Sequence, residues 1–70
     1  MKLYEKLASE IEEQIARGVF RAGERLPSIR QMSQHHELSI TTVVHAYLLL
    51  ESRGLIESHP QSGYFVRESP

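Results

Sequence analysis

The polar side chains best suited to chemistry in this sequence gather in one short segment. Ser39, Thr41 and Thr42 place three hydroxyls within four residues, and His45 follows them. A serine just before a helix accepts a hydrogen bond from an exposed amide of the first turn, and hydroxyls and amides at that end of a helix also suit phosphate oxygens. The segment therefore predicts a phosphate-binding helix start. Ser39 would cap the helix in either case, and the alternative for the other three side chains is an ordinary surface.

Two apolar residues interrupt this polar segment. The core stripe of the expected helix runs through Val43, so Ile40 and Val44 should point away from the core together with Thr41 and His45. Apolar side chains exposed beside a helix start are typical of a partner surface, and the methyl groups of thymine would be one such partner.

The other chemistry-bearing residues give no catalytic or metal-binding pattern. The absence of cysteine excludes disulfides and cysteine-based zinc sites. The four histidines form no H-x-x-x-H pair, so a metal site is kept only as an alternative, which the effect of zinc on thermal stability would test. No serine has the surroundings of an activated nucleophile, and Lys2 and Lys6 lie on an exposed helix without a pocket for a Schiff base. The sequence predicts that the chain is not an enzyme and that these residues hold no cofactor.

Composition limits both the size of the fold and its partners. Seventy residues, 40% of them hydrophobic, make one small domain near the lower limit for a hydrophobic core. No apolar run approaches the roughly 20 residues of a membrane span, and the N-terminus lacks the apolar core of a secretory signal, so we expect a cytoplasmic location and no membrane partner. The formal net charge is −1, so any affinity for nucleic acid must come from where the arginines sit. We expect a domain over residues 1–67 and the start of a linker at the polar residues 68–70.

Hydrophobic periodicity and turn residues divide the chain into three helices and a hairpin. The apolar stripe from Tyr4 to Ile15 predicts the first helix, and Gly18 suits its end. Ser28, with Gln31 three residues later, is a capping-box pattern that begins the second helix. The expected helices span residues 3–17, 29–36 and 40–53, and the expected strands span residues 55–58 and 64–67.

This order of elements predicts a winged helix-turn-helix, an α+β fold that is mainly α. Two helices joined by a short turn at Glu37 and Leu38 form a helix-turn-helix, whose second helix can enter the major groove of DNA by its N-terminal end. The hairpin would be the wing, which can reach the minor groove or the backbone. A winged helix that binds another protein is the alternative, because Leu48, Leu49 and Leu50 cannot all face the core from one helix.

Several short motifs keep a near-constant spacing over almost the whole chain. They are Leu26-Pro27-Ser28-Ile29-Arg30, Thr42-Val43, Ala46-Tyr47, Leu50-Glu51, Gly54-Leu55-Ile56 and Ser62-Gly63-Tyr64-Phe65-Val66. With these motifs the chain resembles the N-terminal winged-helix domain of GntR-type bacterial transcriptional regulators, and it looks most like the MocR branch. The resemblance implies a double-stranded DNA operator as partner. It also implies an aminotransferase-like C-terminal domain that binds pyridoxal phosphate outside this sequence, and we expect such a full-length protein to be a homodimer.

The resemblance also assigns DNA contacts by position. Arg30 matches an arginine that approaches the edge of the major groove. Ile40 stands where many members carry a guanine-reading arginine, which favours an A·T-tolerant step, and Gln61 stands where many members carry glycine in the wing. Protonation of His45 and His59 would strengthen phosphate binding as the pH falls toward about 6. The predicted DNA-binding residues are Arg25, Ser28, Arg30, Ser39, Ile40, Thr41, Thr42, His45, His59, Gln61 and Ser62.

Overall fold

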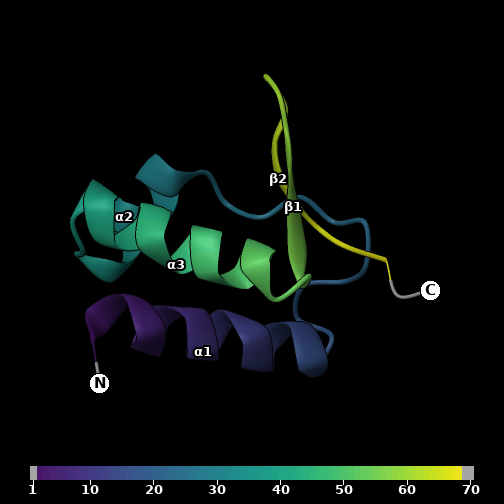
Figure 1. The fold of residues 1–70 in the computed structure, drawn as a ribbon, viewed down its shortest axis with the longest axis horizontal. Helices are drawn as coiled ribbons and strands as arrows, with labels where there is room; N and C mark the ends of the chain where they lie inside the picture. Colours follow the sequence, from purple (N-terminus) through teal and green to yellow (C-terminus); the bar gives the residue numbers. More distant parts are fainter. Residues whose placement is uncertain (1, 69–70) are drawn as a thin grey trace.

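Three helices and a two-stranded antiparallel sheet make up the fold, which a computed structural model describes over residues 2–68 (Figure 1). The elements are α1 (Leu3–Ala16), α2 (Ile29–His36), α3 (Ile40–Ser52), β1 (Ile56–His59) and β2 (Gly63–Val66). α1 and α3 lie side by side, and the hairpin projects past them at one end of α3 (Figure 1). The predicted winged helix-turn-helix is confirmed. Of the expected linker, residues 69–70 lie outside the described part of the chain.

The helix ends follow the local signals in the sequence. Ser28 Oγ accepts a hydrogen bond from the Gln31 amide at 3.1 Å, and Gln31 Oε1 accepts one from the Ser28 amide at 3.0 Å, so the predicted capping box begins α2. α1 and α3 each end one residue earlier than expected. Arg17 and Arg53 occupy the C-cap positions there, and Gly18 and Gly54 follow with positive φ, as a helix-terminating C′ residue requires.

The wing strands are each displaced by one residue from the expected ranges. β1 begins at Ile56 rather than residue 55, and β2 begins at Gly63 rather than residue 64. At the turn, the strands reach His59 and Gly63 because the turn is tighter than expected, with the Ser62 amide donating to the His59 carbonyl at 3.0 Å. Proline at its second position and a φ of 64° at Gln61 are the features of a type II turn. That left-handed conformation favours glycine, so glutamine is strained at this position.

The connector between α1 and α2 pairs with the wing, although the sequence predicts only a loop there. The Gly23 amide donates to the Val66 carbonyl at 2.9 Å, and the Leu26 amide donates to the Tyr64 carbonyl at 2.8 Å. In return, the Val66 amide donates to the backbone carbonyl of Glu24 at 2.9 Å. The connector therefore runs antiparallel beside β2 as a short third strand and fixes the base of the wing to the helices.

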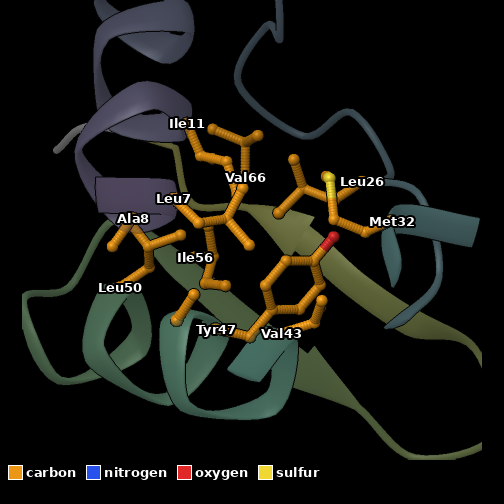
Figure 2. Packing of buried hydrophobic residues seen from close by; sticks show 11 residues of the cluster. Leu7, Ala8, Ile11, Leu26, Met32, Val43, Tyr47, Leu50, Ile56 and Val66 are labelled. Carbon is orange, nitrogen blue, oxygen red and sulfur yellow. The ribbon is translucent and has the colours of Figure 1, made fainter. Parts of the chain in front are cut away.

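The core lies between α1, α3 and the sheet, with Tyr47 near its centre (Figure 2). The Tyr47 side chain is fully buried, and its hydroxyl donates to the Pro27 carbonyl at 2.7 Å. Burial raises the pKa of this phenol, with a smaller contribution from the nearby Tyr64, so it stays a neutral donor. The buried hydrophobic residues are Leu7, Ala8, Ile11, Leu26, Met32, Val43, Ala46, Tyr47, Leu50, Ile56 and Val66.

Candidate nucleic-acid interface

The start of α3 is exposed and carries a partly satisfied set of polar groups. Ser39 Oγ accepts a hydrogen bond from the Thr42 amide at 3.1 Å and lies 2.8 Å from the Thr42 hydroxyl. Ser39 is thus the predicted N-cap, and Thr42, which is half-buried, completes a hydroxyl pair with it. Thr41 is exposed. The first-turn amides of Ile40 and Thr41 have no helical carbonyl to bond, so they remain available to an anion.

The side chains next to the α3 start point in two directions, some away from the core and one toward α1. Ile40 is 48% exposed and Val44 is partly exposed one turn later, which agrees with the prediction that both point away from the core. His45 is also exposed, but its ring meets the ring of Tyr4 edge-on, with the centroids 5.5 Å apart. Contact with α1 places His45 on the flank of the interface rather than at its centre.

The start of α2 is held close to α3 by the core. Because the Tyr47 hydroxyl bonds to the Pro27 carbonyl, the backbone just before Ser28 is fixed relative to α3. Ser28 itself is half-buried and its hydroxyl is occupied by the capping box. Arg30 is exposed on the first turn of α2. Of these two predicted contacts, only Arg30 presents a free polar end.

Arg25 belongs to the wing rather than to the helices. Its backbone forms a bridge with Phe65, and its guanidinium lies against Gly63, where an added Cβ would come within 3.1 Å of Arg25 Nε. At the far end of β1, His59 Nε2 lies 2.9 Å from Glu57 Oε1, and its ring meets that of Phe65 edge-on. His59 therefore has a carboxylate partner of its own.

The tip of the wing is formed by the two remaining predicted residues. Gln61 and Ser62 are both exposed in the turn between the strands. Their side chains are open to a partner beyond the wing.

Ion pairs separate the arginines into two groups. Arg17 pairs with Glu13 at 2.6 Å, and Arg53 pairs with Glu12 at 3.0 Å, so both carboxylates belong to α1. Across residues 2–68, neither Arg25 nor Arg30 has a carboxylate within 4.0 Å. The arginines that remain available to an anionic partner thus include Arg30 on α2 and Arg25 at the wing, although the chain as a whole is slightly acidic.

Comparison with known proteins identifies the family. Residues 3–66 match the profile of the bacterial regulatory proteins of the gntR family. The chain belongs to the GntR family. It is 52% identical over 66 residues to the uncharacterized HTH-type transcriptional regulator YdcR of Escherichia coli strain K12, covering 94% of this chain and 14% of YdcR. It is 35% identical over 65 residues to the Exu regulon transcriptional regulator of the same strain, covering 93% of this chain and 25% of that protein. The chain therefore spans about one seventh of YdcR.

Solved structures of known proteins have the same fold. A GntR family transcriptional regulator from Listeria monocytogenes superposes with a TM-score of 0.95 at 28% identity, over 99% of this chain and 60% of that one. AraR(DBD) in complex with operator ORR3 superposes with a TM-score of 0.90 at 27% identity, over 94% of this chain and 80% of that one. The GntR assignment makes this chain a regulator's DNA-binding domain and not an enzyme, as the sequence predicts.

Two further findings concern the alternatives to DNA binding. None of the helices within residues 2–68 is long and apolar enough to cross a membrane. The same residues bring no three histidine, aspartate or glutamate side chains together in a way that could hold a metal ion.

The sequence did not indicate two tyrosines that contact and position residues of the candidate interface. The sequence indicated Tyr47 only as part of the Ala46-Tyr47 motif, and Tyr4 only as part of the apolar stripe of the first helix. Their contacts with Pro27 and His45 join residues 20 and 41 positions apart. The only available signal was the tyrosine hydroxyl itself, since a buried tyrosine needs a hydrogen-bond partner.

Proposed function

We propose that this GntR-family domain binds double-stranded operator DNA in a sequence-specific manner. Helix α3 with its caps (residues 39–53) reads the major groove, which it enters by its N-terminal end. The hairpin with its flanks (residues 55–67) is the wing. The observation that carries this proposal is the exposed start of α3 with Ser39 and Thr41, together with the exposed Arg30 on α2, which has no carboxylate partner within residues 2–68. Hydroxyls and amides at the positive end of a helix dipole fit phosphate oxygens next to the groove.

The remaining predicted residues fit this placement to different degrees. Arg25, Gln61 and Ser62 act at the wing, where they are exposed. Ser28 acts through the backbone that it caps, and His59 reaches a phosphate only by exchanging its contact with Glu57.

The whole regulator to which this domain belongs is proposed to be a MocR-type homodimer acting in the cytoplasm. Its support is the resemblance of segment 42–47 and of the wing to that branch, together with the small share of YdcR that the chain covers. An aminotransferase-like domain with pyridoxal phosphate would fit the remaining length. One domain alone makes few phosphate contacts, and two copies on a repeated site supply the specificity. The sequence beyond residue 70 tests this assignment, since it must contain a long α/β region with a cofactor lysine.

A titration of the isotope-labelled chain with duplex DNA tests the binding mode. We expect amide shifts at the starts of α2 and α3 and in the wing. We also expect log affinity to fall against log salt with a slope of roughly −3 to −4, as three or four neutralised phosphates require. Shifts confined to α1 and Leu48 would contradict the proposal.

The same titration judges the second candidate, a winged helix that binds protein. The observation in its favour is Leu48, which is 50% exposed on α3, whereas Leu49 packs against the core. A protein-binding domain would leave its spectrum unchanged on addition of DNA and would shift only with a protein partner.

A further inference from the structure

Two apolar side chains lie where the proposed function requires base contacts. Ile40 is 48% exposed on the first turn of α3, and Val44 is partly exposed one turn later. A spacing of four residues puts them on the same side of the helix, about 6 Å apart along its axis. Together they form a short aliphatic strip beside the polar cap.

α3 has no arginine or lysine that could read guanine. The helix Ile40–Ser52 contains neither residue type, and Glu51 is its only acidic side chain. The commonest specific contact to guanine is a bidentate pair from arginine or lysine to O6 and N7. A base edge opposite Ile40 or Val44 meets aliphatic carbon instead.

The apolar group that bases present in the major groove is the 5-methyl group of thymine. A polar base edge placed against aliphatic carbon would lose hydrogen bonds to water without replacement, whereas a methyl group gains from leaving water. We propose that Ile40 and Val44 read thymine methyl groups on two base pairs of the operator that lie about two steps apart. This inference rests on the proposed function and adds the bases that the domain selects.

The dimensions agree with two base pairs about two steps apart. The strip of about 6 Å is close to twice the rise of about 3.4 Å per base pair. Thr41, exposed between the two residues, can bond to any base or to a phosphate and so adds affinity without choosing a base. Leu48 is as exposed as Ile40 but lies about 12 Å farther along α3, away from the inserted end. It is the matched control.

The experiment selects binding sites for the chain from a duplex library with a randomised centre at low salt. The affinity of an enriched duplex is then compared with that of duplexes in which single thymines are replaced by deoxyuridine. Deoxyuridine differs from thymidine only by the missing methyl group. We expect two positions, about two base pairs apart, at which the replacement lowers affinity about fourfold, the value of one buried methylene-sized group.

Variants assign these positions to side chains, with the helical circular dichroism and melting of each verified first. Ile40→Ala should abolish the loss caused by deoxyuridine at one position, Val44→Ala should abolish it at the other, and Leu48→Ala should leave both losses intact. Ile40→Val keeps two methyl groups and should retain most of the thymine preference. Ile40→Arg should change the selected base from thymine to guanine.

The outcomes separate this inference from the proposed function. If enriched duplexes tolerate deoxyuridine everywhere, or if both alanine variants keep the full loss, thymine reading is overturned while DNA binding stands. If the chain binds no duplex more tightly than single-stranded DNA, the proposed function fails, and the thymine inference fails with it.

Discussion

The starts of α2 and α3 use the same cap and differ in what they leave open. At each start a serine hydroxyl accepts the amide of the third helical residue at 3.1 Å. At α2 the third residue is Gln31, whose side chain returns to the Ser28 amide at 3.0 Å and closes the box. At α3 it is Thr42, which is too short to reach back and instead meets the Ser39 hydroxyl. One residue therefore decides whether a helix start is closed on itself or open to a ligand.

Burial and charge increase this contrast. Ser28 is half-buried, whereas Ser39 is exposed. The α1 side of the molecule neutralises Arg17 and Arg53 by pairing, while Arg30 is left unpaired near the α2 start. A slightly acidic chain can thus offer a locally positive surface, because Arg17 and Arg53 pair with carboxylates of α1, whereas Arg25 and Arg30 have no carboxylate partner within residues 2–68.

The largest expected effect comes from a negative charge placed at the open start. Ser39→Asp keeps a good N-cap, so the melting temperature should not fall. Repulsion from the DNA backbone should lower affinity for duplex DNA about 100-fold at low salt, as measured by fluorescence anisotropy. Ser28→Asp is the matched control, with the same charge at the closed start and a smaller expected loss. Equal losses in the two variants would remove the distinction between the two starts.

Removing the unpaired guanidinium of Arg30 on α2 should have the next largest effect. Arg30→Ala should lower duplex affinity about tenfold and reduce the magnitude of the salt slope by about one, because one phosphate contact is lost. Affinity measured over a series of salt concentrations provides both values.

The control for this variant is an arginine that is already paired. Arg17→Ala removes the same charge at the end of α1, where Glu13 neutralises it, and should leave the salt slope nearly unchanged. A slope that changes equally in both variants would mean that the domain responds only to its net charge.

The hydrogen bond that couples the two starts should have a moderate effect on stability. Tyr47→Phe leaves the Pro27 carbonyl without its donor and should cost about 1 kcal/mol, which lowers the melting temperature by roughly 4–8 °C. Tyr4→Phe, at a half-buried tyrosine on α1, should change the melting temperature much less.

The dependence of stability on alkaline pH also tests the burial of the Tyr47 phenol. The folded-state pKa of Tyr47 lies above the ordinary value of 10.0, so its contribution to stability is complete below about pH 10 and is lost as the pH rises further. Tyr47→Phe should remove that part of the alkaline loss. An unchanged alkaline profile in the variant would contradict the burial of the phenol.

The smallest expected effect comes from closing the open start. Thr42→Gln should complete a capping box at α3 and raise the unfolding free energy by about 0.5 kcal/mol, measured by urea denaturation. Duplex affinity should fall a few-fold, because the new side chain occupies the Ser39 amide. Gln31→Thr at α2 should have the opposite effect on stability. A Thr42→Gln variant that binds DNA as tightly as the wild type would show that the opening at α3 is not used.

Much of the fold could be predicted because its signals are local. The caps at Ser28 and Ser39, the glycine ends of α1 and α3, and the apolar stripes depend on residues within one or two helical turns. At residues 59 and 63 the error in the strand ranges arose in the wing turn, where the left-handed Gln61 stands in place of the glycine that such a turn favours.

The sequence by itself determined where the helices begin and end, which faces are apolar, and that a hydroxyl-rich helix start follows a capped one. Only the tertiary structure decided that the connector pairs with β2, that Arg25 belongs to the wing, that Leu48 rather than Leu49 faces outward, and which arginines are neutralised. The physical reason is distance along the chain. Helix propensity and capping act between near neighbours, whereas these contacts join residues that come together only when the core around Tyr47 has formed.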